Sequence, residues 1–249
     1  MTPSRIPSPL PSGCTWSGWA IPDLQHCEEH LCGWIVDPAN TWSNLSYILM
    51  GLWLWSRARR DPAGPLRWFG PAAVVVGVTS FAFHASFTFF FQFFDYVGMF
   101  VFIMLPAALN LRRLGWLSAA RLTLFYWGGI LGSCALLLAF RAAGVNIQPI
   151  FVVEVMLVVA SEAWLAKTRP GTRYADLGWT LLYFGVAVAF WIGDFTRTVC
   201  DPSNHWFQGH AMWHLFGALP FRYAQRFYRQ FPELGPAETG SSSLPPPGP

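Results

Sequence analysis

Seven apolar segments run through this sequence, and each is close to the length that a helix needs to cross a bilayer. They lie at residues 41–56, 68–88, 89–112, 119–140, 147–166, 178–196 and 207–225. A helix rises about 1.5 Å per residue, so roughly 20 apolar residues span ~30 Å of hydrocarbon. The composition agrees, because 53% of the residues are hydrophobic and only 12% are charged. The sequence therefore predicts an all-α integral membrane protein, a bundle of seven transmembrane helices.

Basic residues indicate the topology of these segments, because arginine and lysine accumulate in cytoplasmic loops. They follow the first, third, fifth and seventh segments: Arg57, Arg59, Arg60 and Arg67; Arg112, Arg113 and Arg121; Lys167, Arg169 and Arg173; Arg222, Arg226 and Arg229. This pattern predicts an N-terminus outside and a cytoplasmic C-terminus. We interpret the formal charge of +3 as this topology signal, so no nucleic-acid partner is expected.

The two ends of the chain differ from its middle. We expect an extracytoplasmic N-terminal segment at residues 1–40, a helical membrane domain at 41–229 and a disordered tail at 230–249, which is rich in Pro, Gly and Ser. Residues 1–13 lack the apolar stretch of a cleavable signal peptide. The first apolar segment is therefore expected to direct insertion.

Three histidines lie in or at the end of the apolar segments, where an unpartnered imidazole is expected to be rare. His210 and His214 are four residues apart and so lie on one face of a helix, while His84 comes from a separate segment. Catalytic zinc sites use three such ligands and keep a fourth position open. We therefore predict a metal site within the membrane. The alternative, a hydrogen bond to a neighbouring helix, is better suited to a lone histidine.

Further polar residues reach the same depth in the predicted topology. Ser80 lies one turn before His84, Asp95 about two turns into the third segment and Asp194 near the outer end of the sixth. We predict that Asp95 accepts a proton from water, that Ser80 donates to an oxyanion and that Asp194 orients a ligand histidine. Asp95 could instead orient a histidine, and Ser80 could instead bond within the helices.

Carboxylates crowd the segment before the first membrane helix. Glu28, Glu29 and Asp37 are hard oxygen ligands at a density that suits Ca²⁺. A solvated acidic loop is an equally good interpretation. The remaining histidines are expected to be solvated: His26, His30 and His205.

Four of the five cysteines fall on the outer side of the predicted topology, where an oxidising compartment lets thiols pair. These are Cys14, Cys27, Cys32 and Cys200. Three connectivities are open, and the spacing does not choose between them. Zinc binding by these cysteines is less favoured, because the sequence has no C-x-x-C pair. We interpret Cys134, in the middle of a membrane segment, as a small buried hydrophobe.

The order of these polar blocks resembles the alkaline ceramidase family. That family belongs to a wider group of seven-span intramembrane metal-dependent hydrolases, which includes adiponectin receptors and Per1-like proteins. The matching blocks are CEEH, NTWSNL, SFAFHASF with QFFDY, FWIGDFTRTVC and HAMWHLFG, in this order along the chain.

This resemblance implies roles for the residues singled out above. It implies a zinc site with three ligands: His84, His210 and His214. It further implies that Asp95 activates the attacking water and that Ser80 stabilises the oxyanion. It also implies a disulfide between Cys27 and Cys200, both of which are predicted to face outward.

The resemblance is weaker around Glu28, where alkaline ceramidases bind calcium. Gln25 and His26 stand where an Asp-Trp pair is expected, His30 replaces an Asn and Asp37 stands for a Glu. Glu28 and Asp37 remain the candidates for calcium.

The predicted function is a zinc-dependent amidohydrolase that cleaves the N-acyl amide of ceramide-like lipids to a sphingoid base and a fatty acid. The substrate would enter from the bilayer. Alternatives are a related lipid hydrolase or receptor acting on a different lipid, a haem protein or a transporter. Haem ligands usually come from facing helices, and transporters usually contain repeats. A bacterial inner membrane is the expected location, with the ER or Golgi as the alternative.

Overall fold

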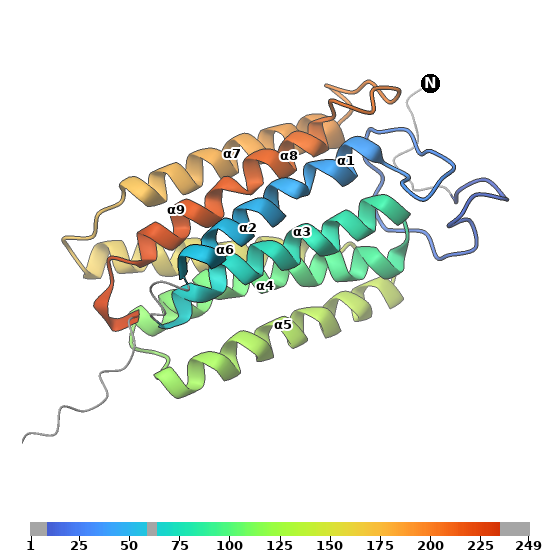
Figure 1. Ribbon diagram of the computed structural model, residues 1–249. Coiled ribbons are helices and arrows are strands. Elements are labelled where there is room, and N and C mark those ends of the chain that lie inside the picture. The colour runs from blue at the N-terminus through green and yellow to red at the C-terminus, as the bar shows by residue number, and fades with distance from the viewer. Residues whose placement is uncertain (1–8, 59–63, 235–249) are drawn as a thin grey trace, which may run out of the picture.

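The computed structural model describes residues 9–58 and 64–234, and every regular element among them is a helix. The elements, in chain order, are α1 (Pro38–Ser43), α2 (Leu45–Ala58), η1 (Gly64–Trp68), α3 (Phe69–Ser86), α4 (Phe89–Arg113), α5 (Ala119–Ala142), α6 (Gln148–Thr168), α7 (Ala175–Phe195), α8 (Gly209–Gly217), α9 (Leu219–Tyr228) and η2 (Pro232–Leu234). The helices run side by side in one bundle, and α5 lies at its edge (Figure 1).

Five helices of the described chain are long and apolar enough to cross a membrane. They are the continuous η1–α3 (Gly64–Ser86), α4, α5, α6 and α7. The prediction of an all-helical integral membrane protein is thus supported. The first and last predicted segments are each divided into two shorter helices, α1–α2 and α8–α9. The count of seven spans and the orientation of the two ends stay predictions.

Both divisions have a local cause. At the first, the side chains of Ser43 and Asn44 donate to the carbonyl of Asn40, at 2.9 and 2.8 Å. These side chains compete with the backbone for a helical acceptor. At the second, Pro220 lies in the first turn of α9 and has no N–H to continue the helical hydrogen bonds.

α3 and α4 form a tight antiparallel hairpin. Phe87 ends α3 in the left-handed conformation (φ 49°), and Thr88 caps α4 by accepting a hydrogen bond from the N–H of Phe91 at 3.5 Å. The turn falls at the boundary between the predicted segments 68–88 and 89–112. At Gly98 a Cβ would lie 2.5 Å from the Thr79 hydroxyl, so glycine allows the two helices their close approach.

A buried ion pair joins the helices at the opposite end of the bundle. Arg113 is fully buried and pairs with Glu162 of α6 through both terminal nitrogens of its guanidinium group. It also donates to Asn110 at 3.1 Å, which accepts a hydrogen bond from the Tyr228 hydroxyl at 2.8 Å. Arg113 therefore links α4, α6 and α9, whereas the sequence pattern predicts that it belongs to a basic loop.

The C-terminal segment begins with packed residues. Leu234 is fully buried in η2, and Glu233 accepts hydrogen bonds from Arg112 and Arg169, at 3.0 and 2.9 Å. The predicted disordered tail, 230–249, therefore starts with ordered residues, and 235–249 lie outside the described residues. So do residues 1–8 and two basic residues of the first predicted loop: Arg59 and Arg60.

The N-terminal segment packs over one end of the bundle, beside the start of α8 (Figure 1). Two disulfides hold it, Cys14–Cys32 and Cys27–Cys200, with Cα atoms 4.9 and 5.6 Å apart. The second joins the segment to the α7–α8 loop and is the pair that the resemblance implied. All four cysteines are in disulfides, so none of them has a free thiol that could bind zinc. Cys134 is partly exposed and packs beside an apolar cluster of α4, α5 and α6.

Candidate metal centre

The three predicted ligand histidines meet at the end of the bundle that the N-terminal segment covers. His84 lies near the end of α3, and its Nε2 is 3.1 Å from Nε2 of His210 in α8. The ring of His214 lies 5.0 Å from that of His84 and 4.5 Å from that of His210, between centroids. All three are at most 6% exposed. The structure thus brings the three imidazoles into one buried cluster.

Contacts from three other helices fix α8 at this place. At Gly209 a Cβ would lie 2.9 Å from the carbonyl oxygen of Phe190 in α7, so only glycine fits without a shift. On the other side, the Ser46 hydroxyl donates to the carbonyl of His214 at 3.1 Å. The Ser43 hydroxyl lies 2.8 Å from Nδ1 of the same histidine. Ser43 therefore fixes the His214 ring, with Nε2 as its remaining ligand atom.

Asp194 connects the cluster to the N-terminal segment. It is fully buried in the last turn of α7, where its Oδ1 accepts a hydrogen bond from the N–H of Cys27 at 3.0 Å. Its Oδ2 accepts a hydrogen bond from the N–H of His210 at 3.1 Å. The predicted role of Asp194 is to orient a ligand histidine. In the structure it holds the backbone of His210, and its Oδ1 also lies 3.6 Å from Nδ1 of His26.

The predicted catalytic pair lies beside the histidines. Ser80 is buried one turn before His84, and its side chain is close enough to the carboxyl of Asp95 in α4 to interact with it. Asp95 is half-buried, and it is close enough to interact electrostatically with Tyr47 and His26. A carboxylate and a hydroxyl thus lie together next to the cluster.

His26 is the member of the cluster that sequence analysis missed. It is 4% exposed, so the prediction that it is solvated is wrong. Its ring stacks on that of His210, with centroids 3.5 Å apart and planes inclined by 20°. Nitrogen atoms of His26, His84 and His210 all lie within 4.8 Å of one another. No local pattern around His26 signals this, because the disulfide of Cys27 and its hydrogen bond to Asp194 bring the loop there.

The calcium candidate Glu28 is already paired. Its Oε1 accepts a hydrogen bond from the N–H of Ala39 at 2.8 Å, and its Oε2 accepts one from Asn40 at 2.9 Å. Nδ1 of His205 lies 3.1 Å from Oε1. Burial raises the pKa of Glu28, and the two backbone N–H groups oppose that rise. Glu28 therefore stabilises the start of α1 from inside the protein, and the solvated acidic loop is not what forms.

The second candidate, Asp37, is paired with imidazoles. Its Oδ1 lies 2.6 Å from Nδ1 of His30, and its Oδ2 lies 3.7 Å from Nδ1 of His84. Burial alone would raise the pKa of Asp37, but the neighbouring imidazoles of His30 and His84 outweigh it, and the pKa is lowered. His30 and His205 both contact carboxylates, although sequence analysis predicts that they are solvated.

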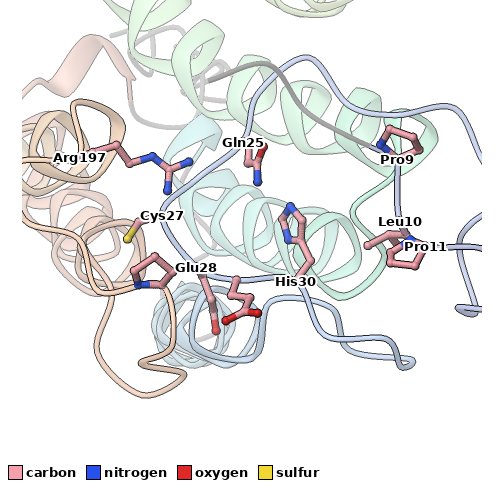
Figure 2. A pocket seen from close by; sticks show the side chains of 10 residues that line it. Pro9, Leu10, Pro11, Gln25, Cys27, Glu28, His30 and Arg197 are labelled. Carbon is pink, nitrogen blue, oxygen red and sulfur yellow. The ribbon is translucent and has the colours of Figure 1, made fainter. Parts of the chain in front are cut away.

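These contacts do not fit a calcium site, which needs six to eight oxygen ligands around one ion. A pocket of about 340 Å³ lies beside Glu28. Figure 2 shows Gln25, His30 and Arg197 among the residues that line it. An imidazole and a guanidinium are not calcium ligands, and the oxygens of Glu28 are taken by N–H donors. Calcium therefore plays no part in the function proposed below.

Calcium is accordingly expected to leave the melting temperature of the wild type unchanged, compared between excess EGTA and millimolar CaCl₂. A ligand at 100 times its Kd stabilises a protein by about 2.7 kcal/mol, a shift of several degrees. The double variant Gln25→Asp/His30→Asn supplies oxygen ligands and should gain a calcium-dependent rise. A rise of that size in the wild type would show that the carboxylates do bind the ion.

A buried cluster of imidazoles at one end of a helical membrane bundle, with a carboxylate and a serine beside it, fits a membrane-embedded metal-dependent hydrolase. Comparison with protein families agrees: the Ceramidase family model matches residues 22–231, most of the chain. The chain belongs to the ceramidase family. No individual curated protein matches it. The matched region runs from the N-terminal segment to the end of α9 and so contains every residue of the cluster.

Proposed function

We propose that the protein is a zinc-dependent amidohydrolase that cleaves the N-acyl amide of ceramide-like lipids, releasing a sphingoid base and a fatty acid. Membership of the ceramidase family supports the substrate class. The observation that carries metal dependence is the 3.1 Å separation of the Nε2 atoms of His84 and His210. Two nitrogens bound to one tetrahedral zinc at about 2.0–2.1 Å lie about 3.3 Å apart. The two imidazoles are thus already spaced as ligands of one ion.

The chemistry of the donor set also fits a cation. Two neutral imidazole nitrogens that face each other at 3.1 Å need a proton or a cation between their lone pairs. His84 and His210 are both buried, which disfavours a charged imidazole, and the neutral imidazole is the form that binds a metal ion. His214, fixed by Ser43, supplies the third nitrogen. When bound, zinc polarises an amide carbonyl and activates water.

The chain's own polar groups supply the proton transfers. Asp95 takes a proton from the attacking water and returns it to the nitrogen of the leaving amine. Ser80 donates a hydrogen bond to the developing oxyanion. Ser80 and Asp95 are close enough to interact with each other beside the histidines. Asp194 acts at a distance from the substrate by holding the backbone of His210.

The same spacing argues against haem. A porphyrin lies between its two axial ligands, and Nε2 atoms 3.1 Å apart leave no room for a ring between His84 and His210.

The proposal includes seven spans, with the divided helices α1–α2 and α8–α9 as the first and last. An N-terminus outside and a C-terminus in the cytoplasm agree with disulfides at the metal end of the bundle, since these form in oxidising compartments. Most of the described arginines lie at the other end, where Arg169 pairs with Glu233 and Arg226 with Asp176, whereas Arg141 pairs with Asp23 at the metal end. A bacterial inner membrane with the site facing the periplasm is the proposed location, and the ER or Golgi is the alternative.

The test is fatty-acid release from a ceramide by detergent-purified protein, with the metal measured by mass spectrometry. We expect about one zinc per chain, as a single three-histidine site requires. Hydrolysis should stop after chelation and return with added zinc. Wild-type protein without metal would refute the proposal. Zinc with hydrolysis of a lipid ester but not of ceramide would keep the metal centre and change the substrate, and a Soret band would revive haem.

A further inference from the structure

His26 belongs to the N-terminal segment, yet its imidazole lies within the metal centre. Its side chain is 5% exposed, and its ring centroid is 3.5 Å from that of His210 and 5.4 Å from that of His84. One ring nitrogen of each of these three histidines lies within 4.8 Å of a ring nitrogen of the other two. Three nitrogen donors at this spacing in one buried site can converge on a single ion.

Two constraints hold His26 at the level of α8. The next residue, Cys27, donates its N–H to Asp194, the same carboxylate that accepts the N–H of His210. Cys27 is also bonded covalently to Cys200 in the α7–α8 loop. His26 therefore cannot leave the centre without the loss of a buried hydrogen bond or a disulfide.

The imidazole itself has an unsatisfied atom. Nδ1 of His26 is buried without a hydrogen-bond partner, and the nearest acceptor of an ion pair, Oδ1 of Asp194, is 3.6 Å away. A buried polar atom left unpaired destabilises the folded chain, and a bond to a metal would remove that penalty. In the stacked arrangement the face of the ring meets His210. The contact of Nδ1 with Asp194 is longer than a hydrogen bond, so rotation about the side-chain torsions can turn a ring nitrogen toward His84 and His210.

We propose that His26 is a ligand of the metal ion, so that the centre has four imidazole donors: His26, His84, His210 and His214. This inference rests on the proposed metal-dependent function. Zinc has no geometric preference from d-electrons and accepts a fifth ligand, so four imidazoles still leave a place for water. The N-terminal segment would then take part in metal binding directly, beyond covering the site.

The test counts imidazoles around zinc by X-ray absorption on the purified wild type and on His26→Trp. The tryptophan keeps an aromatic ring against His210 but brings no metal ligand. We expect four imidazoles in the wild type and three in the variant, with the free zinc concentration at half-occupancy raised by roughly 10-fold or more. His205→Asn removes another histidine of the outer loops, which contacts Glu28, and should leave both values unchanged.

The outcomes separate this inference from the proposed function. Three imidazoles in zinc-loaded wild type, with unchanged affinity in His26→Trp, would overturn the fourth ligand and leave the three-histidine hydrolase intact. Wild type that binds no zinc would overturn both. The wild-type count decides the inference even if His26→Trp fails to fold, and His26→Gln provides a second variant with less bulk.

Discussion

Asp95→Asn is expected to lower the rate of ceramide hydrolysis by about 10²- to 10⁴-fold, the range for loss of a general base. The amide has the size of the carboxylate and can still bond to Ser80, but it cannot accept a proton from water. Zinc content should stay at the wild-type value, since the proposed ligands are imidazoles. The measurement is kcat for fatty-acid release, with bound zinc determined on the same samples.

Ser80→Ala is the companion to this variant, because it removes the other proposed catalytic side chain. It removes the partner of Asp95 and one donor to the oxyanion, with an expected loss of about 10²- to 10³-fold in kcat. Asp95→Glu restores a base and should recover part of the rate. If Asp95→Asn loses zinc together with activity, the residue supports the metal site and is not the base. If its kcat equals that of the wild type, Asp95 has no catalytic role.

Features that depend on residues close in sequence were predictable. The spacing of His210 and His214 places both rings on one helix face whatever the rest of the chain does. The α3–α4 hairpin follows from the length of the apolar run 68–112, which is too long for one membrane helix. Once these two helices are antiparallel, His84 and Asp95 must lie near the same end of the bundle. Most of the predicted site follows from these local rules.

The position of His26 could not be predicted in this way. It lies in a segment without periodicity, and its burial depends on contacts with residues far along the chain, Asp194 and Cys200. Composition and spacing do not predict these two contacts, because the outer cysteines can pair in several ways until the fold is known. The same reason explains why the contacts of His30 and His205 were missed.

Charged residues inside the bundle show a second limit. Arg113 follows the predicted membrane segment 89–112 and belongs to a predicted basic loop, yet it is fully buried against Glu162. Glu154, in the middle of the apolar run of α6, is 5% exposed and accepts a hydrogen bond from Ser133 at 2.5 Å. An ionisable residue within an apolar run indicates a buried polar contact, since the residue needs a partner inside the membrane. The partner itself lies on another helix and cannot be read from the run.

The breaks in the first and last segments connect fold and site. Ser43 at the end of α1 contributes to the break by bonding to Asn40, and the same hydroxyl contacts the ring of His214. A polar residue that weakens an apolar helix thus serves the metal centre. The break in the last segment has a separate cause, Pro220, which follows the helix that carries His210 and His214.

Asp194→Ala is expected to destabilise the protein most strongly. The carboxylate accepts hydrogen bonds from two backbone N–H groups, those of Cys27 and His210. Each buried N–H left unpaired costs about 1–3 kcal/mol, so the variant should lose roughly 2–6 kcal/mol of stability. In a chain of this size that is on the order of 10 °C in melting temperature. Zinc affinity should fall by about 10- to 100-fold, because His210 loses its anchor.

Two further variants identify the cause of this loss. Asp194→Asn keeps one acceptor but turns an N–H₂ donor toward the other backbone N–H, so both effects should be intermediate. Asp201→Ala removes an exposed carboxylate of the α7–α8 loop, which accepts a hydrogen bond from Ser203, and should change stability by at most about 0.5 kcal/mol. If Asp194→Ala melts and binds zinc like Asp201→Ala, then the disulfide of Cys27 alone holds the N-terminal segment over the metal centre.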